Sequence, residues 1–175
     1  MRKEAKTMRN LLKRISALLL CLLLVLSLPV TALAEEAQDS EEGTTLRIAR
    51  RQQFLDFAEN CRLDSYSRNL SVILLTDIDL TGVDFSGIPI FCGNFDGNGH
   101  TVSGLSITRD GSNMGLFRYV DASGVIQNLT VSGKVTPDGS RSAVGGIAGH
   151  NAGKIRNCFF DGTVSGSDDV GGIAG

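Results

Sequence analysis

Short apolar runs separated by glycine dominate the second half of the chain. The runs are three to five residues long and are broken by Gly, Asn and Asp, and 20 of the 21 glycines lie between positions 82 and 175. Runs of this length are too short for helices, which need about ten or more periodic residues, and they suit strands. The pattern therefore predicts a mainly β structure over 82–175.

Two repeated motifs give this β pattern a period. The hexapeptide Val-Gly-Gly-Ile-Ala-Gly occurs at 144–149 and again at 170–175, and the segment 124–135 matches the segment 153–164. A period of roughly 20–50 residues indicates stacked units, each too small to bury its apolar face alone. The second hexapeptide stops at Gly175, so we expect the chain to be cut off within a repeat.

The aligned repeats predict which side chains point inward. We expect Ile126 to stack on Ile155, and Val135 to stack on Val164, because each pair has the same place in the repeat. Strand periodicity would place alternate residues on opposite faces, here the sets Ile126, Asn128, Thr130 and Gln127, Leu129, Val131. A weaker copy upstream would align Val102, Leu105 and Ile107 with Ile126, Leu129 and Val131.

Residues 50–61 carry a helical pattern. Their apolar residues recur at i, i+3, i+4 and i+7, which is one face of an amphipathic helix: Phe54, Phe57, Ala58 and Cys61. Short strands are predicted around it at 46–48, 72–75 and 78–80. Because the first rung of a solenoid would expose its core and its unpaired edge, we expect this helix to plug that end.

The N-terminus has the pattern of a secretory signal peptide, 1–34. Six basic residues precede an apolar run at 15–28, and Ala32-Leu33-Ala34 predicts cleavage before Glu35. A retained membrane anchor is the alternative, although the run is shorter than the about 20 residues that a span needs. We expect 35–43 to be an acidic disordered spacer, 44–81 an N-terminal cap and 82–175 the repeats.

The net charge of the chain without its leader limits which partners it can bind. Without 1–34 the chain has 11 Lys and Arg against 18 Asp and Glu. A negative chain argues against nucleic acid and against anionic membrane surfaces, since both need a basic face. We therefore expect no nucleic acid partner, and no membrane contact after signal cleavage.

Few residues are candidates for chemistry. His100 and His150 are the only histidines, and both are expected in turns. The run Asp96-Gly-Asn-Gly has the opening of a calcium loop but lacks the Glu that such a loop carries at its twelfth position. We expect a tight turn there, with Gly97 and Gly99 at positive φ.

Carboxylates and cysteines leave alternatives open. The carboxylates Asp77, Asp79 and Asp84 are candidate acids of a polysaccharide lyase or glycosidase, or else corner residues of a solenoid, which we favour.

Three cysteines lie beyond the leader: Cys61, Cys92 and Cys158. We expect them to be buried small hydrophobes, because their spacing fits neither a disulfide framework nor a zinc site.

Asparagines recur in the repeats. Asn128 and Asn157 share one repeat position, which predicts a hydrogen-bonded ladder between rungs. Asn128-Leu-Thr and Asn69-Leu-Ser are also glycosylation sequons. The sequence thus predicts no catalytic, cofactor-binding or metal-binding residue.

The hexapeptide, together with Gly-x-Ile-x-Asn-Cys-x-Phe-x-Gly-x-Val at 153–164, resembles the GLUG repeat of bacterial surface proteins. The segments 95–105 and 115–120 resemble the run-in that precedes such repeats, so the resemblance covers about 46–175. It implies an all-β fold: a right-handed parallel β-helix, similar to that of pectin lyases, with a short N-terminal capping helix. The GLUG repeat itself carries no catalytic motif.

The resemblance implies an exported protein, extracellular or at the cell surface. The first hypothesis is a non-catalytic adhesive or ligand-presenting stalk that offers a repetitive β surface to host or cell-surface glycans or proteins. The alternative is the non-catalytic N-terminal part of a secreted enzyme, either an immunoglobulin-A-type metallopeptidase or a carbohydrate-active β-helix.

Overall fold

The computed structural model describes residues 43–138 and 142–175. The expected signal peptide 1–34 and residues 35–42 of the expected spacer lie outside the described residues. The described chain contains one helix, α2 (Arg51–Asn60), among short strands. The strands are β1 (Thr45–Ile48), β2 (Ser71–Leu74), β3 (Ile78–Asp79), β4 (Ile88–Phe91), β5 (Asn94–Asp96), β6 (Thr101–Ile107), β7 (Phe117–Val120), β8 (Val125–Val135), β9 (Ser142–Gly145), β10 (Ala148–Asn151), β11 (Lys154–Val164) and β12 (Asp168–Gly171).

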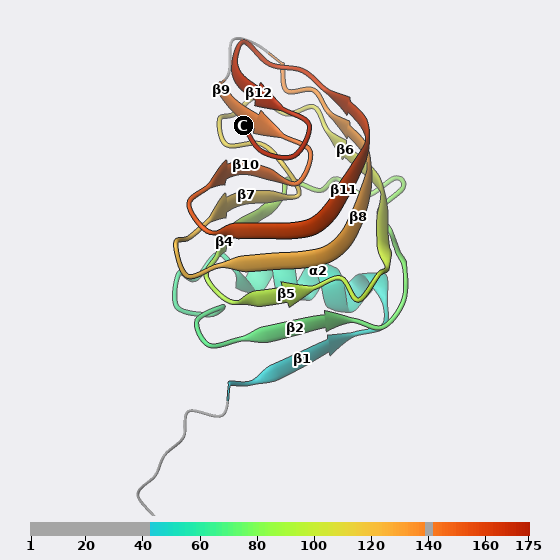
Figure 1. The fold of residues 1–175 in the computed structure, drawn as a ribbon. Helices are drawn as coiled ribbons and strands as arrows, with labels where there is room; N and C mark the ends of the chain where they lie inside the picture. The colour runs from blue at the N-terminus through green and yellow to red at the C-terminus, as the bar shows by residue number, and fades with distance from the viewer. Residues whose placement is uncertain (1–42, 139–141) are drawn as a thin grey trace, which may run out of the picture. The chain divides into compact units, whose positions relative to one another are not determined.

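The strands stack in parallel as a solenoid of about four turns (Figure 1). One sheet has the order β1-β2-β5-β8-β6-β3, with β11 also paired to β8. A second sheet has the order β10-β7-β4, and β12 pairs with β9. This confirms the predicted parallel β-solenoid. The helix of the described region is too short to cross a lipid bilayer.

The repeats stack in the predicted register. Ile155 pairs with Ile126 and Val164 pairs with Val135. The two hexapeptides also coincide, since Val170 pairs with Val144. The lower residues Ile126 and Val135 are fully buried, and their upper partners are half-buried against the same core.

The prediction that alternate residues of 126–131 face opposite sides of the strand is wrong. Ile126 and Leu129 are both buried although they are three positions apart. The cause is Asn128, which has a φ of 53° and turns the strand within β8. This left-handed residue shifts the inward phase by one position, so Leu129 and Val131 face inward after the corner.

The alignment of the weaker upstream copy is also wrong. Val102 pairs with Val131 rather than with Ile126, and Ile126 pairs with Phe95 of β5. The reason is that β8 is long enough to pair with two shorter strands, β5 at its start and β6 at its end. The sequence alignment omitted the first of these two strands.

Helix α2 packs its apolar face into the core, as its periodicity predicted. It begins and ends within one residue of the expected 50–61, and it buries Phe54, Phe57 and Ala58. Phe57 contacts Phe91 and Phe95, each at a ring-centroid distance of 6.0 Å. The aromatic chain continues to Phe117, at 5.3 Å from Phe95, so α2 joins a phenylalanine core that extends into the second full turn.

Candidate functional site

Asparagine and aspartate side chains form a ladder along one corner of the solenoid. The Asn157 amide donates to Asn128 Oδ1 at 2.7 Å, and the Asn128 amide donates to Asp96 Oδ1 at 3.0 Å. Burial acts to raise the pKa of Asp96, but hydrogen bonds from Asn128, the Asn98 backbone N–H and Gln127 outweigh it and hold the pKa below its ordinary value. The predicted ladder is confirmed, and it holds rungs together.

The run Asp96-Gly-Asn-Gly is a tight turn, as expected, but with a different left-handed residue. The residues with positive φ are Asn98, at 53°, and Gly99, at 79°, whereas the φ of Gly97 is not positive. Gly97 is needed for space instead, because a Cβ there would lie 2.5 Å from the Asn128 carbonyl oxygen. Asp96 Oδ1 accepts the Asn98 backbone N–H at 2.7 Å, so this carboxylate is used within the turn.

Asp77 and His100 are brought together by the fold. His100 Nδ1 lies 3.1 Å from Asp77 Oδ1, which also accepts the Thr101 backbone N–H at 2.9 Å. The Thr101 N–H, and then His100, hold the pKa of Asp77 below its ordinary value. An imidazole beside a carboxylate is the base–carboxylate part of a nucleophilic triad, but here the same carboxylate oxygen also accepts a backbone N–H. His100 lies in the turn before β6, as predicted.

The other two candidate carboxylates have partners of their own. Asp79 Oδ1 accepts the Thr81 backbone N–H at 2.8 Å, and hydrogen bonds from the Thr81 side chain, then its backbone, lower the pKa of Asp79. Asp84 forms an ion pair with Arg109. Asp79 thus serves a local turn and Asp84 an ion pair, which supports the corner interpretation for these two carboxylates.

Two of the three cysteines are buried, as predicted, whereas the third is only half-buried against the core. Cys61 and Cys92 are buried and Cys158 is half-buried. Burial, and then the neighbouring Cys92, raises the pKa of Cys61 to about 12, and burial also raises the pKa of Cys158. Such thiols are poor nucleophiles because the thiolate is the reactive form. No described cluster of three or more His, Cys, Asp or Glu side chains has metal-binding geometry.

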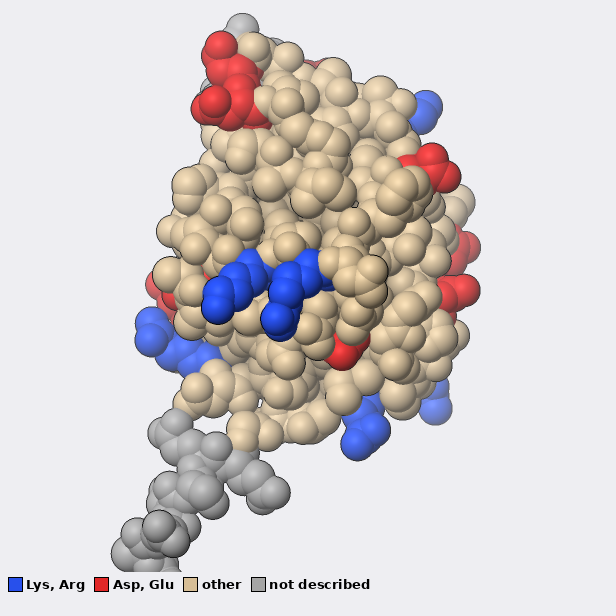
Figure 2. Space-filling view, in the orientation of Figure 1, with Lys and Arg blue, Asp and Glu red and all other residues tan. Residues whose placement is uncertain are grey.

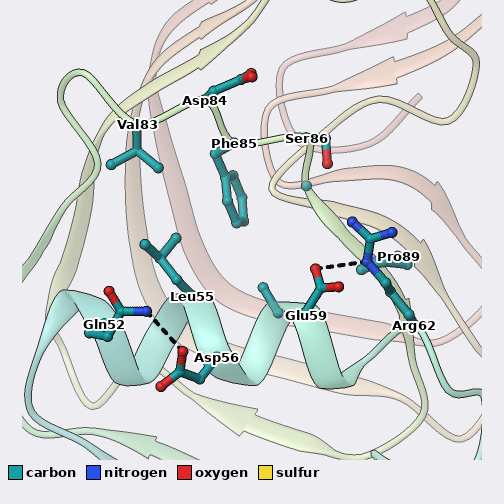
Figure 3. Close-up of a pocket in the computed structure, with 12 residues that line it drawn as sticks. Gln52, Leu55, Asp56, Glu59, Arg62, Val83, Asp84, Phe85, Ser86 and Pro89 are labelled. Carbon is teal, nitrogen blue, oxygen red and sulfur yellow. Dashed lines mark hydrogen bonds and ion pairs between the residues drawn. The ribbon is translucent and has the colours of Figure 1, made fainter.

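A groove runs along the outside of the solenoid beside α2. We call it the outer groove. It consists of two adjoining hollows, of about 370 and 480 Å³, that share Arg62, Ser86 and Pro89. The first lies between α2 and the 83–87 segment, where Phe85 points toward Leu55 of the helix (Figure 3). The second is lined by residues that precede and begin β7, together with residues at the end of β6: Ile107, Arg109, Asp110, Met114 and Arg118.

Two ion pairs lie in the outer groove. Arg62 donates to Glu59 at 2.7 Å, and Arg109 pairs with Asp84. These side chains are between 62% and 71% exposed, and exposed pairs stabilise a fold little. The groove therefore offers both donors and acceptors that can change partners without loss of the fold.

An aromatic stack lies on the outer side of the β4–β7–β10 sheet. Tyr119 and His150 are register partners on β7 and β10, with ring centroids 4.9 Å apart and planes 9° from parallel. The prediction that His150 is a turn residue is wrong, because it lies in β10. The sequence contained a signal for this stack. The similarity of 115–117 to 146–148, when it is extended by two residues, aligns His150 with Tyr119. Arg118, which lines the outer groove, directly precedes Tyr119 in β7.

Charged side chains form small separate groups on the face shown in Figure 2, with an acidic group at the upper left and two basic side chains side by side near the middle. The view has the orientation of Figure 1 and shows mostly uncharged surface.

Stacked parallel rungs joined by a corner ladder define a repeat-built β-solenoid protein. Residues 140–165 match the family described as the GLUG motif. The chain is thus a β-solenoid that matches the GLUG motif over this one segment.

Two curated relatives match this chain, one over most of its length and the other over about half. Halomucin of Haloquadratum walsbyi is 36% identical over 134 residues, which cover 70% of this chain and 1% of that protein. A "putative Gly-rich membrane protein" of Evansella cellulosilytica is 35% identical over 96 residues, covering 48% of this chain and 11% of that protein. The chain thus spans a small part of these relatives. No solved structure matches it significantly.

Proposed function

We propose that this protein is an exported, non-catalytic module of the cell surface that presents its outer face to glycans. The observation that carries the proposal is the GLUG repeat, together with the similarity to a halomucin and to a protein named as a membrane protein. The cleaved leader predicted at 1–34 supports export.

The chemistry of the outer groove and the neighbouring stack supports a glycan as the ligand. A sugar ring has an apolar C–H face and a rim of hydroxyls that both donate and accept hydrogen bonds. Tyr119 and His150 offer flat rings with polar edges, and the groove offers guanidinium donors beside carboxylate acceptors. The pairing of Arg62 and Arg109 with acids leaves little excess charge, which favours neutral over strongly anionic glycans.

The test is a glycan array probed with the exported protein and with variants. We expect the double variant Tyr119→Ala, His150→Ala to bind at least tenfold more weakly than the parent. Phe159→Ala is the matched control, because Phe159 is an aromatic residue that is 62% exposed on β11. Equal loss in both variants, or absence of any glycan signal, would contradict the proposed ligand.

Location is tested separately on intact cells of the source organism. An antibody against 43–175 should label unpermeabilised cells, and protease added outside should remove the label. Labelling that requires permeabilisation would contradict the surface assignment and leave the glycan test independent of it.

A further inference from the structure

The outer groove separates its charges between its two hollows. Three carboxylates and one guanidinium group line the first hollow: Asp56, Glu59, Asp84 and Arg62. Three guanidinium groups and one carboxylate line the second hollow: Arg62, Arg109, Arg118 and Asp110. The strands that contribute to the second hollow lie within the stack, since β7 pairs with β4 and β10, and β6 pairs with β3 and β8. The groove is therefore nearly neutral as a whole, but it has a negative end and a positive end.

Each ion pair of the groove joins its two hollows. Glu59 of the first hollow pairs with Arg62, which lines both hollows. Asp84 of the first hollow pairs with Arg109 of the second. Because both pairs are largely exposed, they stabilise the fold little, and a ligand can take the place of either partner.

One charged side chain at each end is held by uncharged groups. Asp56 Oδ1 accepts a hydrogen bond from the Gln52 amide at 2.9 Å (Figure 3). Arg118 donates to the backbone carbonyl oxygens of Ser112 and Asn113, at 3.2 and 3.4 Å. These contacts orient the two side chains without neutralising their charges. A ligand with a cation at one end and an anion at the other would complement both.

Apolar side chains line both hollows between the charged groups. Phe85 points toward Leu55 in the first hollow (Figure 3), Ile107 and Met114 line the second, and Pro89 lines both. Sugar rings have C–H faces that can pack against such side chains. The volumes of about 370 and 480 Å³ lie within the range of about 300–1,000 Å³ that is typical of ligand pockets. The groove thus has room and apolar surface for sugar rings.

We propose that the outer groove binds a dipolar saccharide, in which an amino sugar with a free ammonium group is linked to a uronic acid. The ammonium group lies in the first hollow beside Asp56, and the carboxylate lies in the second hollow beside Arg118. A guanidinium group can donate two parallel hydrogen bonds to a carboxylate, which makes the second hollow selective for the acid. The saccharide therefore has one direction in the groove, with its amine toward α2 and its acid toward β7. This inference rests on the proposed glycan ligand and names its chemical class.

The test compares four forms of one disaccharide, glucosamine linked to glucuronic acid, as ligands of the exported protein. The amine is either free or acetylated, and the acid is either free or methyl-esterified. Calorimetric titration at about pH 6 keeps a free amine protonated and a free acid ionised. We expect the form with both groups free to bind at least tenfold more tightly than each of the other three. This advantage should shrink as salt is added, because salt screens exposed charges.

Two variants assign each charge to its end of the groove. Asp56→Asn should remove the preference for the free amine and keep the preference for the free acid. Arg118→Gln should remove the preference for the free acid and keep that for the free amine. Asp161→Asn is the matched control, because Asp161 is exposed on β11, outside the groove, and the substitution should leave both preferences unchanged.

Several outcomes would overturn the inference. Equal binding of the four forms would overturn it and leave the glycan proposal standing. Absence of binding by all four forms would also overturn it, and the glycan array would then decide the glycan proposal separately. Loss of both preferences in either variant would show that the two ends do not act separately. Tighter binding of the peptide Lys-Gly-Gly-Glu than of the dipolar disaccharide would assign the groove to a peptide instead.

Discussion

Asparagine serves two purposes at the corners of this solenoid. Asn98, Asn128 and Asn157 all have positive φ, which asparagine tolerates better than most residues. Asn128 and Asn157 also use their side-chain amides to connect successive rungs. A single residue type thus supplies the bend and the connection between turns.

Substitutions at Asn128 should separate these two contributions. Asn128→Gly keeps the positive φ and loses the amide hydrogen bonds, so we expect a loss of about 1–3 kcal/mol. Asn128→Ala loses the same bonds and adds left-handed strain of about 1–2 kcal/mol. Urea denaturation of both variants measures the difference, and equal stability would contradict the strain argument.

The lowered pKa of Asp96 predicts a pH dependence. A carboxyl whose pKa falls on folding stabilises the protein above its unfolded pKa, near the ordinary 3.8, and loses that contribution as pH falls through the folded pKa. The stability advantage of the parent over Asp96→Asn should therefore be full near pH 7 and shrink below about pH 4. Thermal unfolding across this range checks it, and an advantage that grows on acidification would contradict the sign.

At the scale of elements, α2 and the strands of the rungs are held in the fold by different interactions. The rungs pair through backbone hydrogen bonds, whereas α2 packs on the core through side chains, with Phe57 against Phe91 and Phe95. The helix also contacts β1, β3 and β4. The helix is therefore held to the solenoid by packing instead of by strand pairing.

Truncation of Phe57 on α2 should destabilise the fold strongly. Phe57 is 1% exposed, so Phe57→Ala should cost about 3–5 kcal/mol. Leu63→Ala is the control, because Leu63 is 67% exposed just after the helix and should change stability by at most about 0.5 kcal/mol. Similar unfolding free energies for the two variants would show that α2 is peripheral to the core.

The cost in stability of replacing a stacked isoleucine by alanine should depend on how deeply that isoleucine is buried. Ile126 is fully buried between rungs, so Ile126→Ala should cost about 2–5 kcal/mol. Ile155 has the same register position but is half-buried, so Ile155→Ala should cost less. Chemical denaturation of both variants gives the comparison, and a larger loss at Ile155 would mean that the upper rung is covered.

At the scale of the whole molecule, the predicted leader decides where the protein acts. The basic start, the apolar run and Ala32-Leu33-Ala34 predict export and cleavage before Glu35. N-terminal sequencing of protein recovered outside the cell should begin at Glu35. Recovered protein that begins at Met1 would support the retained anchor.

The sequence by itself was enough to predict the mainly β solenoid, the helix near 50–61 and the register of Ile126 on Ile155. These features follow from local periodicity and from near-identical repeats, because residues in the same repeat position meet the same neighbours. The asparagine ladder followed from the same repetition. The pattern of residue types thus carried the architecture and the pairing of its best-matched turns.

Only the tertiary structure decided the features that join segments unlike in sequence. It placed Phe95 opposite Ile126, brought His100 to Asp77, and stacked His150 on Tyr119. These contacts depend on how far the chain travels around each turn, and that path length varies with the corners and loops. One left-handed residue, Asn128, also changed which side chains face the core, because strand alternation holds only while the backbone stays extended.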